Sequence, residues 1–201
     1  MVNKYDPDVH HRRSIRLKRY DYSQSGVYFV TLCVANHSLY FDDPAIKDFA
    51  EKCWVEIPHH FPSVILDQWI VMPNHLHGIV ICRGVQLNAL TSNALINANI
   101  ELNGPPTNTT NASNHIIYSK ISPRRNTISV IIRTYKAAVT TLCRRNGYNY
   151  FRWQRNYYEH IIRDENELNL IRQYITTNPK QWDIDSENPN APIEKVQRYP
   201  W

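Results

Sequence analysis

The sequence has no apolar run approaching the roughly 20 residues that a membrane span requires. Its first residues, Met-Val-Asn-Lys-Tyr-Asp, also lack the apolar core of a secretory signal peptide. No internal repeat is apparent, and none of the cysteines forms a C-x-x-C pair (Cys33, Cys53, Cys82 and Cys143). These absences argue against a membrane protein, a disulfide framework and a zinc finger. We therefore expect a cytoplasmic protein.

The length of 201 residues suits a single domain with a sizeable core. We expect one domain over 1–201, with a basic arm at 1–21, an Asn-rich insertion at 83–126 and a tail with Pro and Trp at 180–201. The insertion has few apolar residues, which favours a surface excursion without chemistry of its own. We expect the tail to be an extended segment packed over the surface.

A formal net charge of +5 and a pI near 9.0 are compatible with a polyanionic partner, although a merely soluble basic protein would look the same. Basic residues gather in the N-terminal arm and on one face of a predicted helix over 127–145. Both groups are candidates for contact with nucleic-acid phosphates. They are Arg12, Arg13, Arg16, Lys18 and Arg19 in the arm, and Arg133, Lys136 and Arg144 on the helix.

Periodicity predicts an α+β protein. Strands are expected over 27–34 and 64–72, and at 75–82 after a Met-Pro-Asn turn, so that the last two form a hairpin. A further strand is expected within 148–162. A helix should begin at Pro44 and stop at Pro58, because apolar residues recur there at spacings of three and four.

Two more helices are predicted in the second half of the chain. The first, over 127–145, would be capped by Asn126 and would bury the stripe Ile128, Ile131, Tyr135, Ala138 and Leu142. The second would be capped by Asp164, with Glu167 completing a capping box, and would end before Pro179.

His75-Leu76-His77 is the main candidate for chemistry. Alternate residues of a strand share one face, so the two imidazoles would project together and could bind a metal ion. Two histidines on a strand can also be ordinary hydrogen-bonded residues of a sheet. A glycine inside a strand, such as Gly78 directly after the pair, often marks a place where a ligand or another backbone approaches closely, which fits a substrate beside the histidines.

Tyr174 and Asn178 lie one turn apart on the last predicted helix. The Asn178 amide oxygen could complete a metal site and direct the phenol of Tyr174 at a bound group. A tyrosine pKa of about 10 makes the phenol a poor nucleophile, so it needs an electrophile activated by a cation, such as a phosphodiester. Tyr157 and Tyr158 are competing nucleophile candidates, although aromatic residues on a sheet more often belong to the core or stack on bases.

These motifs, in this order, resemble those of the REP-associated tyrosine transposases, within the single-tyrosine HUH transposases and nucleases. The resemblance lies in Arg12-Arg-Ser-Ile-Arg-Leu, Gly26-Val-Tyr-Phe-Val-Thr, Met72-Pro-Asn-His-Leu-His-Gly, Trp153-Gln-Arg-Asn-Tyr-Tyr-Glu-His and Tyr174-Ile-Thr-Thr-Asn-Pro. It spans most of the chain outside the insertion and the tail. The insertion is longer than the connection usual in that family, and the tail has no obvious match.

The resemblance implies a central antiparallel sheet of the ferredoxin or RRM-like HUH type, flanked by helices. It implies that His75, His77 and Asn178 hold Mg²⁺ or Mn²⁺, and that Tyr174 attacks single-stranded DNA at hairpin-forming repeats. The products would be a 5′-phosphotyrosine and a free 3′-hydroxyl, in a DNA-associated protein of bacterial type. His160 matches a family position, and a structural hydrogen bond is its simplest role. The resemblance leaves open whether the protein is a monomer or a homodimer.

Two other functions remain compatible with the sequence. A sheet with aromatic residues and basic flanks can bind DNA or RNA without cleaving it. A metal-dependent enzyme acting on a small molecule is a further alternative. It would not explain the basic arm, whose charges suit contact with nucleic-acid phosphates.

Overall fold

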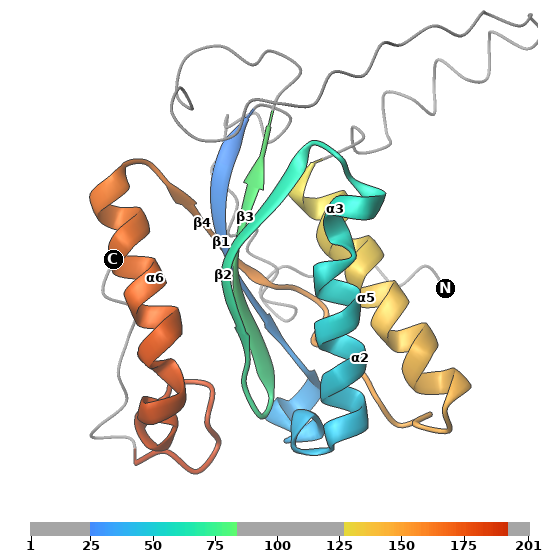
Figure 1. Ribbon diagram of the computed structural model, residues 1–201. Helices are drawn as coiled ribbons and strands as arrows, with labels where there is room; N and C mark the ends of the chain where they lie inside the picture. Colours follow the sequence, from blue (N-terminus) through green and yellow to red (C-terminus); the bar gives the residue numbers. More distant parts are fainter. Residues whose placement is uncertain (1–24, 84–126, 193–201) are drawn as a thin grey trace, which may run out of the picture.

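The computed structural model describes residues 25–83 and 127–192 (Figure 1). The expectations for the basic arm (Arg12, Arg13, Arg16, Lys18 and Arg19), for Asn126, and for segments 84–126 and 193–201 lie outside the described residues. In chain order the strands are β1 (Gly26–Cys33), β2 (Val64–Val71), β3 (His75–Cys82) and β4 (Tyr158–Ile162). The α-helices are α2 (Pro44–Val55), α3 (Ile57–His60), α5 (Ile128–Arg145) and α6 (Glu165–Thr177). Short 3₁₀ helices are η1 (Ala35–His37), η2 (Tyr40–Asp42) and η3 (Asn178–Ile184).

The four strands form one antiparallel sheet in the order β2-β3-β1-β4. With helix α2 between β1 and β2 and helix α5 between β3 and β4, this is the ferredoxin-like βαββαβ arrangement. The predicted hairpin of β2 and β3 is confirmed, and the Met72 N–H donates to the His75 carbonyl across its turn at 2.8 Å. The predicted α+β class with a central antiparallel sheet is therefore confirmed.

Helices cover both faces of the sheet, with α2 and α5 on one side and α6 on the other (Figure 1). Tyr28, Val30 and Leu32 of β1 belong to the large core cluster with α2 and α5. The alternate residue Phe29 belongs instead to a smaller cluster with Ile171 and Ile175 of α6. Alternation along β1 thus separates the two layers.

Helix α6 is also held to the sheet by an ion pair. Arg172 donates from Nε to Asp67 Oδ1 at 2.9 Å and from Nη2 to Asp67 Oδ2 at 2.6 Å. Asp67 lies in β2 where the register with β3 shifts between Leu66 and Trp69. A two-bond arginine–carboxylate contact fixes direction as well as distance, so it orients the helix over the sheet.

The start of α6 follows the predicted capping pattern with one difference. Asp164 Oδ1 accepts the Glu167 N–H at 2.9 Å. The Glu167 carboxylate, however, reaches back to the Arg163 N–H at 2.7 Å and lies 2.7 Å from His160 Nε2. His160 therefore makes the structural hydrogen bond that was its simplest interpretation, and it joins β4 to α6.

The buried stripe of α5 differs from the predicted one. Ala138 is exposed and Leu142 is half-buried, whereas Val139 and Cys143 are buried. After Tyr135 the buried residues are spaced by four, at Val139 and Cys143. The prediction instead placed the next buried residue three positions on, at Ala138. The N-cap residue is Thr127.

The tail is not an extended segment at its start, contrary to our prediction. Its first residues belong to η3 (Asn178–Ile184), with Pro179 in the first turn as proline tolerates. All four cysteines are free thiols, in agreement with the prediction. Among the described residues, no helix has the length and apolarity needed to cross a membrane.

Gly78 was wrongly interpreted as a ligand approach. A Cβ atom at Gly78 would overlap the Trp54 ring of α2. Gly78 follows His77 in β3, so it faces α2 while the histidines face α6. The requirement for glycine comes from core packing on the opposite side of the sheet.

Gly78→Ala is therefore expected to destabilise the protein by about 1–3 kcal/mol through overpacking, measured by urea denaturation. Trp54→Phe removes the part of the indole that the new methyl group would strike. The double variant should thus lose less stability than the sum of the two single variants. Simple additivity would contradict this assignment.

Candidate metal centre

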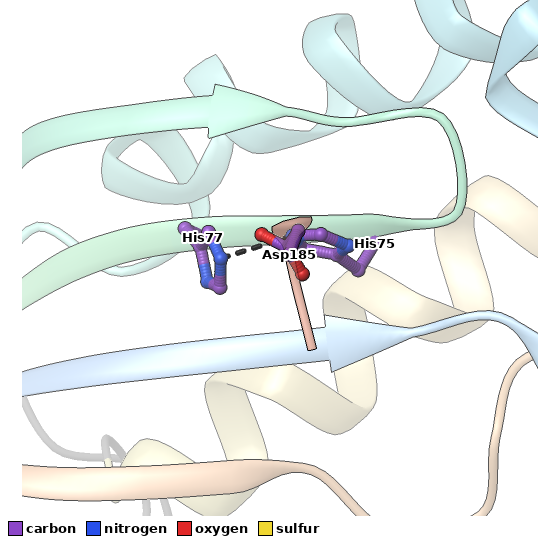
Figure 2. Close-up of side chains that lie close together, drawn as sticks. All are labelled: His75, His77 and Asp185. Atoms are coloured by element: carbon purple, nitrogen blue, oxygen red, sulfur yellow. Dashed lines mark hydrogen bonds between the residues drawn. The ribbon is translucent and has the colours of Figure 1, made fainter. Parts of the chain in front are cut away.

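His75 and His77 lie side by side on one face of β3, as predicted (Figure 2). Helix α6 lies on this side of the sheet, since its Tyr174 contacts His77. Their Nε2 atoms are 2.9 Å apart, and both side chains are fully buried. His75 Nδ1 lies 2.8 Å from Asn74 Oδ1, and His77 Nδ1 lies 2.9 Å from Thr31 Oγ1 on the neighbouring strand. The outer ring nitrogens are thus engaged, and the Nε2 atoms converge.

Both imidazoles are neutral at physiological pH because burial disfavours the charged form. Burial lowers the pKa of His75 to about 4, a shift that Asp185 partly opposes. Burial, followed by repulsion from His75, holds the pKa of His77 well below its usual value. Neutral imidazole is the form that binds metals.

The third member of the cluster is Asp185, which lies between the two histidines in the view of Figure 2. One ligand atom from each of His75, His77 and Asp185 lies within 4.8 Å of the others. Asp185 is 5% exposed. We call these three residues the His-His-Asp cluster, and the arrangement can bind a metal ion.

Asp185 is held by its own segment and by the end of α6. Its Oδ1 accepts the Glu187 N–H at 2.7 Å, and its Oδ2 accepts from Asn178 Nδ2 at 2.9 Å. Farther along, the Glu187 carbonyl accepts from Asn74 Nδ2 at 2.6 Å, which ties the segment to the β2–β3 turn. The carboxylate is therefore fixed from both sides.

Asn178, the third ligand implied by the resemblance, also lies in this site. Its side chain is buried, and its Oδ1 has no hydrogen-bond partner within the described part of the chain. A buried polar atom without a partner costs free energy unless a bound ion or water satisfies it. The neutral imidazoles, the Asp185 carboxylate and this oxygen together fit a divalent ion.

Tyr174 points into the same site from α6. Its Oη lies 3.4 Å from His77 Nε2, and its ring contacts the His77 ring with centroids 5.3 Å apart. Burial raises the pKa of Tyr174, and the carboxylates of Asp185 and Glu187 raise it further. The phenol is therefore protonated at neutral pH.

The two competing tyrosines lie elsewhere. Tyr157 packs against the large core cluster, with the Lys136 ammonium 5.9 Å from its ring centroid. Tyr158 is on the α6 side of the sheet and contacts Phe29, with ring centroids 6.2 Å apart. The Tyr174 hydroxyl, by contrast, contacts the cluster, 3.4 Å from His77 Nε2.

The residues of the predicted basic face of α5 differ in their exposure to solvent. Arg133 and Arg144 are exposed. Lys136 is half-buried, and its ammonium donates to the carbonyls of Gln154 and Asn156 at 2.9 and 3.0 Å. Burial lowers the pKa of Lys136 to about 8. Arg133 and Arg144 are therefore better placed than Lys136 for contact with a phosphate.

Sequence reasoning missed Asp185. It lies in a tail without periodicity, where an isolated acidic residue is usually solvent-exposed. The one local hint is Asn178, because an amide at the end of a helix often hydrogen-bonds to the chain that follows. Only the folded chain brings Asp185 to the histidines.

Because the two histidines are neutral in the folded protein, we expect its stability against unfolding to decrease in acid. Both imidazoles gain protons in the unfolded chain below about pH 6.5 but resist them in the folded one. The stability that they contribute is thus intact above pH 6.5 and is lost as the pH falls toward 4. Metal-free protein should show a falling Tm over this range, followed by circular dichroism. The His75→Gln/His77→Gln variant should show a flatter profile, and an equally steep one would assign the effect to other groups.

The chain is similar to known proteins in both sequence and fold. No family model matches the sequence. A solved structure of a REP-associated tyrosine transposase bound to a REP hairpin is 16% identical, with a TM-score of 0.54, and the match covers 92% of this chain and 96% of that one. At this identity the likeness establishes the fold. An uncharacterized protein of Haemophilus influenzae is 36% identical over 195 residues, covering 92% of this chain and 97% of that protein. The chain therefore belongs to the same family as the Haemophilus influenzae protein, and it has the fold of the REP-associated tyrosine transposase.

Proposed function

We propose that the protein is a metal-dependent single-stranded DNA endonuclease and strand transferase of the transposase kind, with Tyr174 as its nucleophile. The observation that carries the proposal is the position of the Tyr174 hydroxyl, 3.4 Å from His77 Nε2 at the edge of the His-His-Asp cluster. A nucleophile beside a cation site is the arrangement needed for attack on a phosphodiester.

The cofactor would be Mg²⁺ or Mn²⁺, held by His75, His77 and Asp185, with Asn178 Oδ1 as a further ligand. A carboxylate and an amide oxygen beside two imidazoles suit a hard divalent cation such as Mn²⁺. When bound, the ion would supply positive charge against the non-bridging oxygens of the scissile phosphate. The residues of the chain would supply the nucleophile and position it.

In the cleavage step, Tyr174 Oη forms a bond to phosphorus while the bond from phosphorus to the 3′-oxygen breaks. The phenol loses its proton and the departing 3′-oxygen gains one, so the products are a 5′-phosphotyrosine and a 3′-hydroxyl. Reverse attack by a 3′-hydroxyl rejoins a strand without nucleotide hydrolysis, because the covalent link keeps the phosphoester bond energy.

The raised pKa of Tyr174 bears on when this step occurs. Burial and the nearby carboxylates keep the phenol protonated and weakly nucleophilic in the protein alone. The helix holds the ring against His77, so little reorientation is needed when a phosphate arrives. The site is thus positioned for attack but unreactive without its cation and substrate.

The proposed substrate is single-stranded DNA that folds into a hairpin. The solved neighbour bound to a REP hairpin supports this class of substrate. The exposed Arg133 and Arg144 of α5, and the basic arm, would contact phosphates without reading sequence.

The test is incubation of the purified protein with end-labelled hairpin DNA and Mn²⁺, followed by denaturing gels and mass mapping of the linked residue. The expected result is cleavage with a protein–DNA adduct at Tyr174, and none in EDTA. A protein that retards the hairpin but never cuts it would be a non-catalytic binding module. Binding that ignores salt would instead point to an enzyme for small molecules.

A further inference from the structure

The two histidines of the cluster differ in what holds their outer ring nitrogens. His75 Nδ1 faces the amide oxygen of Asn74 at 2.8 Å. His77 Nδ1 faces the hydroxyl of Thr31 at 2.9 Å. An amide oxygen can only accept a hydrogen bond, whereas a hydroxyl can donate or accept. The two partners therefore impose different limits on where each imidazole carries its proton.

The orientation of the Asn74 amide is fixed by its nitrogen. Asn74 Nδ2 donates to the Glu187 carbonyl at 2.6 Å and to the His37 carbonyl at 3.3 Å. Turning the amide would set its oxygen against two carbonyl oxygens. His75 must therefore carry its proton on Nδ1, which leaves a lone pair on Nε2. This is the tautomer that binding of a metal ion through Nε2 requires.

The contact between the two rings decides which nitrogen of His77 carries the proton. His75 Nε2 carries a lone pair, so the hydrogen on the 2.9 Å contact must come from His77 Nε2. His77 Nδ1 then accepts from the Thr31 hydroxyl. Phe29 stacks on the His77 ring with centroids 5.3 Å apart, which helps to hold its plane. In the metal-free protein, the two histidines are thus opposite tautomers.

We propose that Asn74 and Thr31 are positioning residues for the metal centre: Asn74 keeps His75 in the ligand tautomer, and Thr31 allows His77 to change tautomer when a divalent ion binds. The inference rests on the metal site of the proposed function. In this change, His77 releases a proton from Nε2 and takes one up at Nδ1, so its charge stays zero. The Thr31 hydroxyl rotates from donor to acceptor, which no aliphatic side chain could do.

The first measurement compares Mn²⁺ affinity in Thr31→Val and Thr31→Ser. Valine keeps the shape but removes the hydroxyl that would accept the Nδ1 proton of His77 in the metal-bound protein. We expect a loss of about 10–100-fold, the usual effect of losing such a supporting contact. Serine retains the hydroxyl and should restore most of the affinity. Thr141→Val on α5, whose hydroxyl donates to the Ala137 carbonyl at 2.8 Å, is the matched control and should bind as the wild type does.

The second measurement reads the tautomers by ¹H–¹⁵N spectra of the imidazole nitrogens. Metal-free protein should show His75 protonated on Nδ1 and His77 on Nε2. Diamagnetic Zn²⁺ should move the His77 proton to Nδ1 and leave His75 unchanged. The proposal is overturned if metal-free His77 already carries its proton on Nδ1, or if Thr31→Val binds Mn²⁺ as the wild type does. A wild type that binds no ion would refute the metal site of the proposed function, and the metal-free spectrum would then decide whether Asn74 and Thr31 set the tautomers.

Discussion

Tyr174→Phe is expected to abolish the covalent protein–DNA adduct while hairpin binding changes little. The variant removes one oxygen and keeps the ring that packs on His77 and Phe29. Cleavage should fall by roughly a thousandfold or more, because the variant lacks the oxygen that forms the phosphoester in the proposed mechanism. Denaturing gels measure the adduct, and native gels at fixed salt measure binding.

Tyr158→Phe is the matched control, since Tyr158 is on the same side of the sheet and also contacts Phe29. It should cleave as the wild type does. Tyr157→Phe tests the other face of the sheet in the same way. An adduct that persists in Tyr174→Phe and disappears in either control would transfer the nucleophile to that residue and contradict the geometry proposed for cleavage.

Features set by neighbouring residues were predictable from the sequence. Alternation in 75–82 placed His75 and His77 on one face, and Met72-Pro-Asn supplied the turn that makes β2 and β3 a hairpin. The cap at Asp164 followed from its own side chain and from Glu167. In each case the determining contacts span only a few residues, so sequence spacing carries the information.

Features set by contacts between distant segments were not predictable. Gly78 is explained by Trp54 of α2, which no local pattern connects to β3. Asp185 reaches the histidines because η3 turns the chain back after α6 and Glu187 anchors it to Asn74. Motif spacing identified Asn178, which lies in the site, but it could not identify the carboxylate that Asn178 contacts.

This contact between Asn178 and Asp185 bears on which residue is the third ligand. The resemblance implies Asn178, whereas the His-His-Asp cluster contains Asp185. The two assignments are compatible if the carboxylate is the stronger ligand and Asn178 both orients it through Nδ2 and offers Oδ1, which has no hydrogen-bond partner in residues 25–83 and 127–192. A charged ligand should contribute more to the affinity for a hard cation than a neutral amide does.

Asp185→Asn is therefore expected to weaken Mn²⁺ binding by about 100-fold or more, exceeding the usual effect of losing a supporting contact. The variant removes the charge with little change of shape. Asn178 can turn its amide and present Oδ1 to the new amide nitrogen, so the fold should be preserved. Cleavage should fall at low Mn²⁺ and recover partly as Mn²⁺ is raised, because the nucleophile is intact. Calorimetric titration and a cleavage series over Mn²⁺ concentration measure the two effects.

Glu187→Gln is the matched control for Asp185→Asn, because Glu187 is a carboxylate of the same segment that contacts Cys33 and His37 outside the cluster. It should bind Mn²⁺ with nearly wild-type affinity. Asn178→Ala should give an intermediate loss, since the Asp185 carboxylate remains but loses one of its donors. If Asn178→Ala were the more damaging change and Asp185→Asn bound normally, the amide would be the third ligand. Asp185 would then act only as the group that holds Asn178 in place.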